Sequence, residues 1–454
     1  MTNHPQNAEK FIADEARVNW HDAALWHVRN KRDLAVDTVP EWEQLREMAS
    51  QIKAHTLANL RTYLIDFEQN AMANGVEVHW ASNAESHNQI VLEILQRNNV
   101  KKIVKSKSML TEECGLNPFL EERGFEITDT DLGERIIQMR QEPPSHIVLP
   151  AIHIKKEEVG DLFRKELGAE PGNNDPTYLT HQARIHLRKK FMECQAAITG
   201  VNFGVVETGE VVVCTNEGNA DMGVHLAPVQ IHSMGIEKLI PRKKDLAVMV
   251  RLLARSATGQ PVTVYTSHHQ KPAKGAEKHI ILVDNGRSKR LTMEKYRSSL
   301  KCIRCGACMN TCPIYRRSGG HSYHFTIPGP IGSILAPVTD MTAQSDLPFA
   351  STLCGSCGDV CPVKIDIPNQ LYQWRQDIAE AGLLSPGKQK SMKVLSSLLA
   401  SPRAYRNFGR MMRLGLRILP KFLMTNRYNT WTKGRDLPAA PPKSFKAWYK
   451  KNHR

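Results

Sequence analysis

The sequence predicts an α/β domain followed by a small helical, cysteine-rich domain and a basic helical tail. Three observations predict this order. Short β-rich runs alternate with helical patterns after residue 75, seven of the ten cysteines fall within residues 302–361, and most of the net positive charge follows residue 400. Alternating strands and helices are typical of a largely parallel sheet covered by helices. A chain of 454 residues is long enough for two or three domains.

Residues 1–75 are expected to form a helical N-terminal arm. Apolar residues recur at helical spacing, as at Leu57, Leu60, Leu64 and Phe67, with polar residues between them. Few strand-forming residues interrupt the pattern. We therefore expect an arm or packing layer that ends where the period of the sequence changes.

Residues 76–290 are expected to form the α/β domain. Helical patterns such as His87–Arg97 and Lys244–Arg255 lie between the β-rich runs. The last run is followed by an Asp-Asn-Gly turn at 284–286, which places the boundary near residue 290. The expected strands are Val76–Trp80, Ile103–Val104, Phe125–Thr128, His146–Ile154, Ala196–Val201, Val205–Glu207, Val211–Thr215, Val262–Thr266 and Ile280–Val283.

Residues 291–385 are expected to form a dicluster iron–sulfur domain. A C-x2-C-x2-C-x3-C-P run is typical of a loop that wraps an iron–sulfur cubane, and its last cysteine ligates the neighbouring cluster. A second, shorter run that also ends in Cys-Pro follows it. This crossover predicts one cluster on Cys302, Cys305, Cys308 and Cys361, and a second on Cys312, Cys354 and Cys357.

The second cluster lacks one thiolate. Counting back three residues from Cys354, where a fourth ligand is expected, gives Ser351. Three thiolates suit a 3Fe-4S cluster, or a 4Fe-4S cluster with one iron open to a small oxygen ligand, which could act as a Lewis acid toward a hydroxy acid. The sequence leaves open whether Ser351, a water or nothing provides the fourth ligand of the second cluster. It favours electron relay over direct catalysis.

Structural zinc knuckles are the main alternative, because pairs of C-x2-C also suit tetrahedral zinc. Zinc would leave a seventh cysteine over, so the iron–sulfur interpretation fits better. A disulfide framework belongs to short secreted chains, and no charged-then-apolar signal segment is expected in residues 1–14. We interpret Cys114, Cys194 and Cys214 as small buried hydrophobic residues.

The formal net charge of +15 belongs mainly to the region 386–454. Residues 401–454 hold fourteen Lys or Arg against the single acid Asp436. From Pro402 to Leu423, basic residues recur on one helical face and apolar residues on the other. Such a helix suits an anionic membrane surface, an acidic partner, or ordinary packing with a solvated basic face. The basic residues are Arg403, Arg406, Arg410, Arg413, Arg417 and Lys421, and the apolar ones are Phe408, Met411, Met412, Ile418, Leu419 and Phe422.

The sequence argues against several partners and locations. It has no zinc-finger spacing or RNA-binding signature, so no nucleic acid is expected. It has neither G-x-G-x-x-G nor a Walker motif, which gives no support to nicotinamide or nucleoside triphosphate binding. Electrons would then leave through a partner subunit or a quinone-linked acceptor. No apolar run approaches eighteen residues, so we expect a soluble, cytoplasmic protein, peripheral at the membrane if the tail binds there.

Five motifs in the two domains occur together in an arrangement that resembles the lactate utilisation protein B family. They are Ile198-Thr199-Gly200, Val206-Glu207-Thr208-Gly209, Thr215-Asn216-Glu217-Gly218-Asn219, Pro328-Gly329-Pro330-Ile331-Gly332 and Cys354-Gly355-Ser356-Cys357-Gly358-Asp359-Val360-Cys361-Pro362. The resemblance covers nearly the whole chain and implies seven cysteine ligands. It implies an α/β fold similar to the CoA-transferase and ribose-phosphate-isomerase group. It also implies an iron–sulfur subunit of a system that oxidises L-lactate to pyruvate, beside a second cysteine-rich subunit and a smaller related α/β subunit.

Two places in the α/β domain are candidates for ligand chemistry. Lys105 and Lys107 follow a predicted strand, and loops at the carboxyl ends of strands are where α/β sheets bind ligands. They suit a carboxylate or phosphate, or form a solvated turn. Glu207 also lies at a strand end, where the resembled fold group can use a glutamate as nucleophile, although a turn acid is the simpler interpretation.

Three functions remain open at this point. The leading one is an electron-transfer subunit of an L-lactate-oxidising system. The second is a partner-binding scaffold whose clusters are structural. The third is a stand-alone iron–sulfur oxidoreductase that acts on another 2-hydroxy acid.

Overall fold

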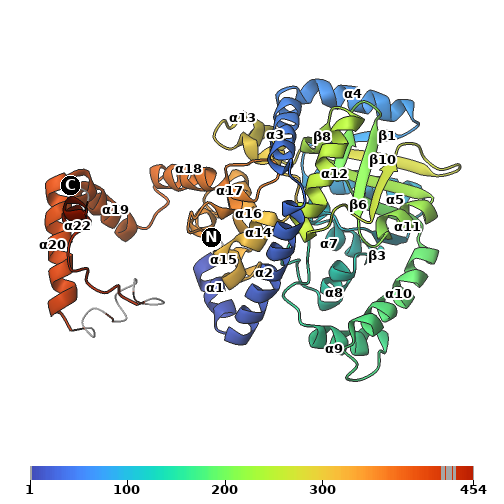
Figure 1. Cartoon of the computed structure of the whole chain (residues 1–454). Helices are drawn as coiled ribbons and strands as arrows, with labels where there is room; N and C mark the ends of the chain where they lie inside the picture. Colours follow the sequence, from blue (N-terminus) through green and yellow to red (C-terminus); the bar gives the residue numbers. More distant parts are fainter. Residues whose placement is uncertain (1–2, 421–424, 426–431, 433–435, 453–454) are drawn as a thin grey trace. The chain divides into compact units, whose positions relative to one another are not determined.

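The computed structural model describes residues 3–420, 425, 432 and 436–452. The chain divides into two compact units, Met1–Ile378 and Ala379–Arg454 (Figure 1). The first holds the main sheet and both cysteine motifs. The second holds the helices α19 (Pro386–Ala400), α20 (Pro402–Ile418) and α22 (Phe445–Asn452).

The main sheet has six parallel strands in the order β1-β10-β7-β4-β2-β3. Helices cover both faces of the sheet, as Figure 1 shows, and side chains on both faces are buried, so an α/β fold is confirmed. The strands are β1 (Glu77–Ala81), β2 (Lys102–Lys105), β3 (Glu126–Asp129), β4 (Ala196–Gly200), β7 (Val229–Gly235) and β10 (Glu277–Val283).

The helices on the two sheet faces come from different parts of the chain. α5 (Ala84–Arg97), α6 (Met109–Glu113) and α7 (Leu116–Glu121) share one core with the sheet. On the other face lie α4 (Leu60–Ala73), α10 (Pro176–Glu193) and α11 (Asn219–Leu226). Two more helices, α8 (Leu132–Arg140) and α9 (Lys156–Leu167), form a separate small core with α10.

A second sheet of four strands has the order β8-β5-β6-β9. Its strands are β5 (Phe203–Val205), β6 (Glu210–Thr215), β8 (Leu239–Ile240) and β9 (Tyr265–His269), with the short helix η1 (Ile236–Lys238) leading into β8. The pairs β5–β6 and β6–β9 are antiparallel. This sheet carries the two expected strands near residues 205 and 211, and helix α12 (Lys243–Thr258) packs on it.

One strand assignment from the sequence was wrong, and one strand was missed. The expected strand His146–Ile154 is a series of turns, in which the Ser145 N–H donates to the Pro150 carbonyl at 3.1 Å. The central strand β7 was missed because Gln230, His232 and Ser233 hide its apolar pattern. These polar side chains are buried and are paired inside the protein; His232, for example, hydrogen-bonds to Thr199 at 2.6 Å.

The N-terminal helices pack on both the α/β domain and the cysteine-rich region. They are α1 (His4–Ile12), α2 (Glu15–Asp37) and α3 (Trp42–Ala58), followed by α4. The Asp14 carboxylate caps α2 by accepting the Arg17 N–H at 2.9 Å. α2 packs on α12 of the α/β domain and also on helices of the cysteine-rich region, and α3 packs on α12. These helices therefore join the two regions.

The cysteine-rich region consists of short helices around two loops. They are α13 (Arg287–Thr292), η2 (Arg297–Lys301), α14 (Ala307–Thr311), α15 (Pro313–Ser318), η3 (His321–Tyr323), α16 (Gly329–Thr339), η4 (Leu347–Phe349), α17 (Ser356–Asp359) and α18 (Ile367–Glu380). The segment between the cysteine motifs is packed, since α16 is almost wholly buried and contacts α14 and α15. The boundary expected near residue 290 lies inside α13.

The described part of the basic tail contains the helices α20 and α22, and the described residues 436–444 that precede α22 are not helical. The Arg residues from Arg403 to Arg417 lie on α20, and the apolar side chains of Met411 and Ile418 are also exposed. Lys421 and Phe422, expected on the same helix, lie outside the described residues. No helix among the described residues is long and apolar enough to cross a membrane.

Candidate iron–sulfur sites and an adjoining cavity

The two cysteine motifs have the same local backbone. Arg304 and Leu353, each directly before a cysteine, have φ angles of 61° and 55°. Gly306 and Gly355, each directly after that cysteine, have φ angles of 76° and 90°. Residues in this left-handed region turn the chain sharply, so the loop curls around the space that its cysteines face.

The first group of cysteines surrounds one small cavity. Cys302, Cys305 and Cys308 of the first motif line it together with Cys361 of the second motif. These are the four residues that the spacing assigns to one cluster. The rest of the wall is mainly apolar, with Ile303, Ile331, Val363, Ile365 and Ile367 among the lining residues.

The donor set of this cavity fits an iron–sulfur cluster. All four cysteines are free thiols. Burial, followed by the neighbouring thiols, raises the pKa of Cys305 and of Cys308. Thiolates gathered in such a site are unfavourable on their own and become favourable beside metal ions. Backbone N–H groups also point at sulfur, because Arg304 N donates to Cys302 Sγ at 3.4 Å and Ile365 N to Cys361 Sγ at 3.3 Å.

The second group consists of Cys312, Cys354 and Cys357. The charge of Cys354 influences the pKa of Cys312, and both influence that of Cys357, which burial raises to about 12. Cys354 is exposed, whereas the other two are buried. Cys357 also influences the pKa of Cys308, so the two groups are neighbours.

Ser351 occupies the position in the second loop that Cys302 has in the first. The Leu353 N–H donates to Ser351 Oγ at 3.1 Å, just as the Arg304 N–H donates to the Cys302 sulfur. Arg375 fixes the Ser351 backbone by donating to its carbonyl at 2.7 Å. The hydroxyl is therefore held where the spacing calls for the fourth ligand.

Buried cations from the N-terminal helices enclose the first group. Arg46 of α3 donates from Nε to the Cys361 carbonyl at 3.0 Å, and Arg32 of α2 donates to the Val360 carbonyl at 3.5 Å. Lys53 of α3 is 1% exposed and donates to the carbonyls of Glu237 and Leu239. Burial lowers the pKa of Lys53 to about 8, and the charge of Cys302 opposes this shift. No sequence pattern predicted these cations, because no motif links residues so far apart.

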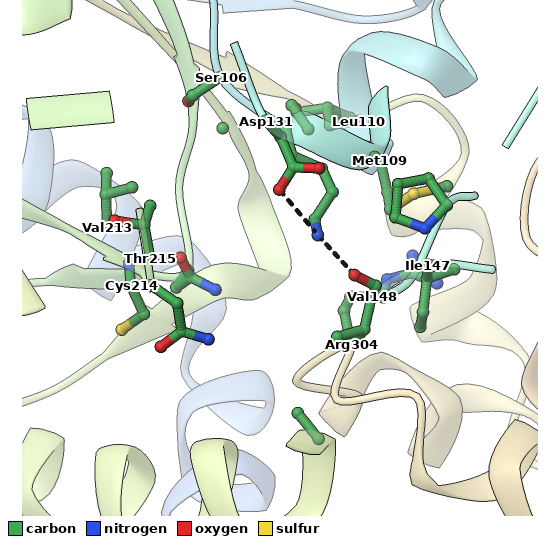
Figure 2. Close-up of a pocket in the computed structure, with 18 of the residues that line it drawn as sticks. Ser106, Met109, Leu110, Asp131, Ile147, Val148, Val213, Cys214, Thr215 and Arg304 are labelled. Carbon is green, nitrogen blue, oxygen red and sulfur yellow. Dashed lines mark hydrogen bonds and ion pairs between the residues drawn. The ribbon is translucent and has the colours of Figure 1, made fainter. Parts of the chain in front are cut away.

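A larger cavity of about 510 Å³ lies at the carboxyl edge of the main sheet (Figure 2). The segments that follow β2, β3 and β4 line it, as do β6 and the turns at 147–152. Arg304 of the first cysteine loop also lines it and is labelled in Figure 2. The α/β domain and the cluster loop thus share one cavity.

The two candidate lysines, Lys105 and Lys107, have different surroundings in the structure. Burial alone would lower the pKa of Lys105, but the carboxylates of Asp129, Glu112 and Glu134 raise it well above its ordinary value. Its Nζ lies 2.7 Å from Asp129 and 3.1 Å from Glu112, and Lys105 does not line the cavity. The charge of Lys105 is therefore paired with carboxylates inside the protein, away from the cavity. Lys107 does line the cavity.

Lys107 is held at the cavity wall by two contacts. Its Nζ donates to the Val148 carbonyl at 2.8 Å and lies 3.5 Å from Asp131, as the dashed lines in Figure 2 mark. Glu207 is exposed and accepts the Lys243 N–H at 2.9 Å, at the start of α12. It does not line the cavity. Its carboxylate lies at the N-terminus of α12, where a negative charge is favourable.

The three remaining cysteines lie apart from both groups. Cys114 is part of the core beneath the sheet, and Cys194 is partly buried. Cys214 lies on β6 at the wall of the larger cavity, where burial raises the pKa of its thiol to about 11. A thiol of that kind is protonated at neutral pH, which agrees with a packing role.

Comparison with known proteins assigns three consecutive parts of the chain to families. Residues 64–292 match the LUD domain, 298–365 a 4Fe-4S dicluster domain, and 376–454 the C-terminal region of lactate utilisation protein B. Lactate utilization protein B of Bacillus cytotoxicus is 41% identical over 432 residues, covering 92% of this chain and 90% of the relative. The uncharacterized electron transport protein YkgF of Escherichia coli K12 is 38% identical over 461 residues, covering 98% and 95%.

A solved structure of a DUF162 family protein from Deinococcus radiodurans covers 49% of this chain and 98% of its own, at 11% identity and a TM-score of 0.28. The two relatives, by contrast, match along almost the full length of both chains. The chain belongs to the lactate utilisation protein B family.

Proposed function

We propose that this protein is the iron–sulfur electron-transfer subunit of a system that oxidises L-lactate to pyruvate. The observation that carries the proposal is the grouping of seven cysteines into two adjacent sets, one of which encloses a cavity with its fourth cysteine supplied by the other motif. Relatives along the whole chain are named for lactate utilisation and for electron transport. When bound, iron–sulfur clusters supply one-electron carriers.

The arrangement of the two groups supports a direction for electron flow. Ile147 lines both the cavity at the sheet edge and the cavity of the first group. The second group is a neighbour of the first and has the exposed Cys354. Electrons that enter beside the α/β domain would therefore pass through the first group to the second, and leave where a partner can approach.

The two cysteine groups offer different ligands, which supports different cluster types. Cys312, Cys354 and Cys357 supply three thiolates, and the Ser351 hydroxyl stands at the fourth corner. We propose a 4Fe-4S cluster at the first group. At the second we propose a cluster with one oxygen-ligated iron, which turns into a 3Fe-4S cluster when that iron is lost.

The proposed partners are a second cysteine-rich subunit and a smaller related α/β subunit of the same system. The exposed arginines of α20 support a contact with an acidic surface, either of a partner or of a membrane. The described surface of α20 also exposes apolar side chains, such as Met411 at 67%, that a partner or membrane would cover.

The test starts from anaerobically purified protein. We expect about seven to eight iron and a similar amount of acid-labile sulfide per chain. Stoichiometric zinc with negligible sulfide would overturn the proposal.

A redox titration followed by EPR then separates electron transfer from a scaffold role. Clusters that change state at physiological potentials support electron transfer, and clusters that stay in one state support a scaffold. L-lactate should reduce the clusters only when the partner subunits are present. Reduction of the isolated chain by L-lactate would instead identify it as a stand-alone oxidoreductase.

A further inference from the structure

We propose that the cavity at the sheet edge binds a small carboxylate, and that Arg304 couples its occupancy to the first cysteine group. The coupling, but not the binding, rests on the proposed function, because it requires a redox-active cluster at that group. The cavity volume of about 510 Å³ is within the usual range for small-molecule sites, about 300–1,000 Å³. Its position outside the carboxyl ends of parallel strands is where such sheets bind ligands.

Two buried donors in the wall have no partner in the described part of the protein. Ser106 is 5% exposed and its Oγ makes no hydrogen bond there. Arg304 has a side chain that is 13% exposed, and its Nη1 likewise has none. Leaving a buried donor unsatisfied is costly, and the cost is larger for a charged group. An anion in the cavity removes this cost at Arg304, and Ser106 offers a second donor, directly or through an enclosed water.

The charges of the wall favour a singly charged ligand. Four cations and four carboxylates line the cavity, so they nearly balance. Burial, followed by the nearby Asp131, raises the pKa of Glu217 to about 7, and burial lowers the pKa of Lys238, so the two shifts oppose each other in the net charge of the wall. A wall whose charges nearly balance accommodates a singly charged carboxylate better than a dianionic phosphate, because burying a second uncompensated charge is costly. The cations are Lys107, Lys238, Arg287 and Arg304, and the acids are Glu113, Asp131, Glu217 and Glu237.

Arg304 connects the cavity to the cysteines through a single residue. Its backbone N–H donates to Cys302 Sγ, while its guanidinium lines the cavity and contacts Glu113 at 3.3 Å. Glu113 in turn contacts Arg287 at 2.9 Å, which holds the guanidinium group in place. An anion bound to Arg304 offsets positive charge beside the first group, so it lowers the reduction potential there. By linkage, reduction weakens anion binding by the same factor.

Binding is tested by isothermal titration of the cluster-loaded full chain with L-lactate, pyruvate and inorganic phosphate under anaerobic conditions. We expect at least one of the two carboxylates to bind, and phosphate to bind weakly or not at all. Arg304→Gln should weaken carboxylate binding about tenfold or more, and Ser106→Ala should weaken it several-fold. The matched control is Arg164→Gln, an exposed arginine on α9 outside the cavity lining, which should leave binding unchanged.

The coupling has its own readout. The potential of the first cluster, followed by EPR, should fall when the carboxylate is added to wild type and should not move in Arg304→Gln of equal iron content. If Arg304→Gln loses iron, Arg304→Lys keeps the charge but loses the planar fork, and should show an intermediate shift. Binding of phosphate in preference to both carboxylates, or no binding, overturns the site. Carboxylate binding without a potential shift overturns the coupling.

These outcomes are distinguishable from failure of the proposed function. Clusters that stay in one redox state would disprove electron transfer and, with it, the coupling, but would leave carboxylate binding in place. Clusters that relay electrons in a chain that binds no carboxylate would disprove the cavity as a ligand site and leave the electron-transfer proposal intact.

Discussion

The loops 302–312 and 351–361 share a backbone but have different surroundings. A methyl group added to Gly306 would lie 2.9 Å from His146 and 3.1 Å from Val148, whereas one added to Gly355 would meet nothing within 4 Å. The first loop is packed against the α/β domain, and the second has the exposed Cys354. The difference teaches that spacing sets which atoms face a cluster, while packing sets its potential and its access to partners.

The largest expected effect comes from the crossing of cysteines between the loops. Cys302→Ala and Cys361→Ala should abolish the same EPR signal and about half of the iron, because both residues line one cavity. Cys357→Ala should abolish the other signal. Iron analysis and EPR of the three variants test the grouping. Losses from Cys302→Ala and Cys361→Ala that fall on different clusters would contradict it.

Ser351→Cys makes the loops more alike. A thiolate at this position should give a second cluster that retains all its iron during oxidation, with a shifted potential, because the hydroxyl is held like the Cys302 sulfur. Oxidised wild type should instead show a 3Fe-4S signal or lose one iron readily.

Ser356→Cys is the matched control for Ser351→Cys, since Ser356 bonds to Thr311 and lies outside the ligand position. EPR and iron counts after ferricyanide treatment provide the measurement. Identical behaviour of wild type and Ser351→Cys would show that the fourth corner is filled from elsewhere.

Substituting the two equivalent glycines compares the packing of the loops. Gly355→Ala places a side chain at positive φ and should cost about 1–2 kcal/mol. Gly306→Ala carries the same strain and also meets His146 and Val148, so it should lower thermal stability further and release iron faster. Melting curves and chelator-driven iron release measure both. Equal losses of thermal stability and of iron in the two variants would mean that His146 and Val148 move aside at little energetic cost.

Removing a cation beside the first loop should have a smaller effect, limited to the reduction potential of the first cluster. Lys53→Gln keeps a donor for the Glu237 and Leu239 carbonyls but removes a charge beside Cys302. We expect the potential of the first cluster to fall, because positive charge favours the reduced state, and that of the second to change little. A redox titration of both EPR signals measures this. Equal shifts in both would argue against a local effect.

The smallest effect on the loops should come from deleting residues 401–454. Iron content and both EPR signals should stay the same, while association with membrane vesicles or partner subunits should lose its salt-sensitive part. Co-sedimentation at low and high salt tests this. Loss of soluble expression would instead indicate that the tail helix is needed for folding.

The sequence predicted local features better than long-range ones. The three cysteines of the first motif that line one cavity are close in the chain, and the Cys-Pro signature of the second motif indicated that Cys361 joins them. The sequence also predicted the α/β order, but polar residues that pair across the core concealed β7. Lys105 and Lys107 look alike in sequence, and only the carboxylates around Lys105 distinguish them.

Residues that connect distant segments left no trace in the sequence pattern. Arg46 meets Cys361 only because α3 folds over the cysteine region. In the sequence, Arg304 is one of two residues between Cys302 and Cys305. Its importance depends on its side chain, which lines the cavity at the sheet edge. Neither the periodicity of a helix nor the spacing of a motif contains this information.

The exchange of cysteines between the motifs also has a mechanical consequence. A cluster held by Cys302 and Cys361 closes the chain between them into a ring, and one held by Cys312 and Cys357 closes a second ring inside it. Both rings contain α16. Closing long loops lowers the entropy of the unfolded chain, so the clusters act as cross-links that hold this buried helix in place. Losing them would loosen the segment between the motifs before it affects the sheet.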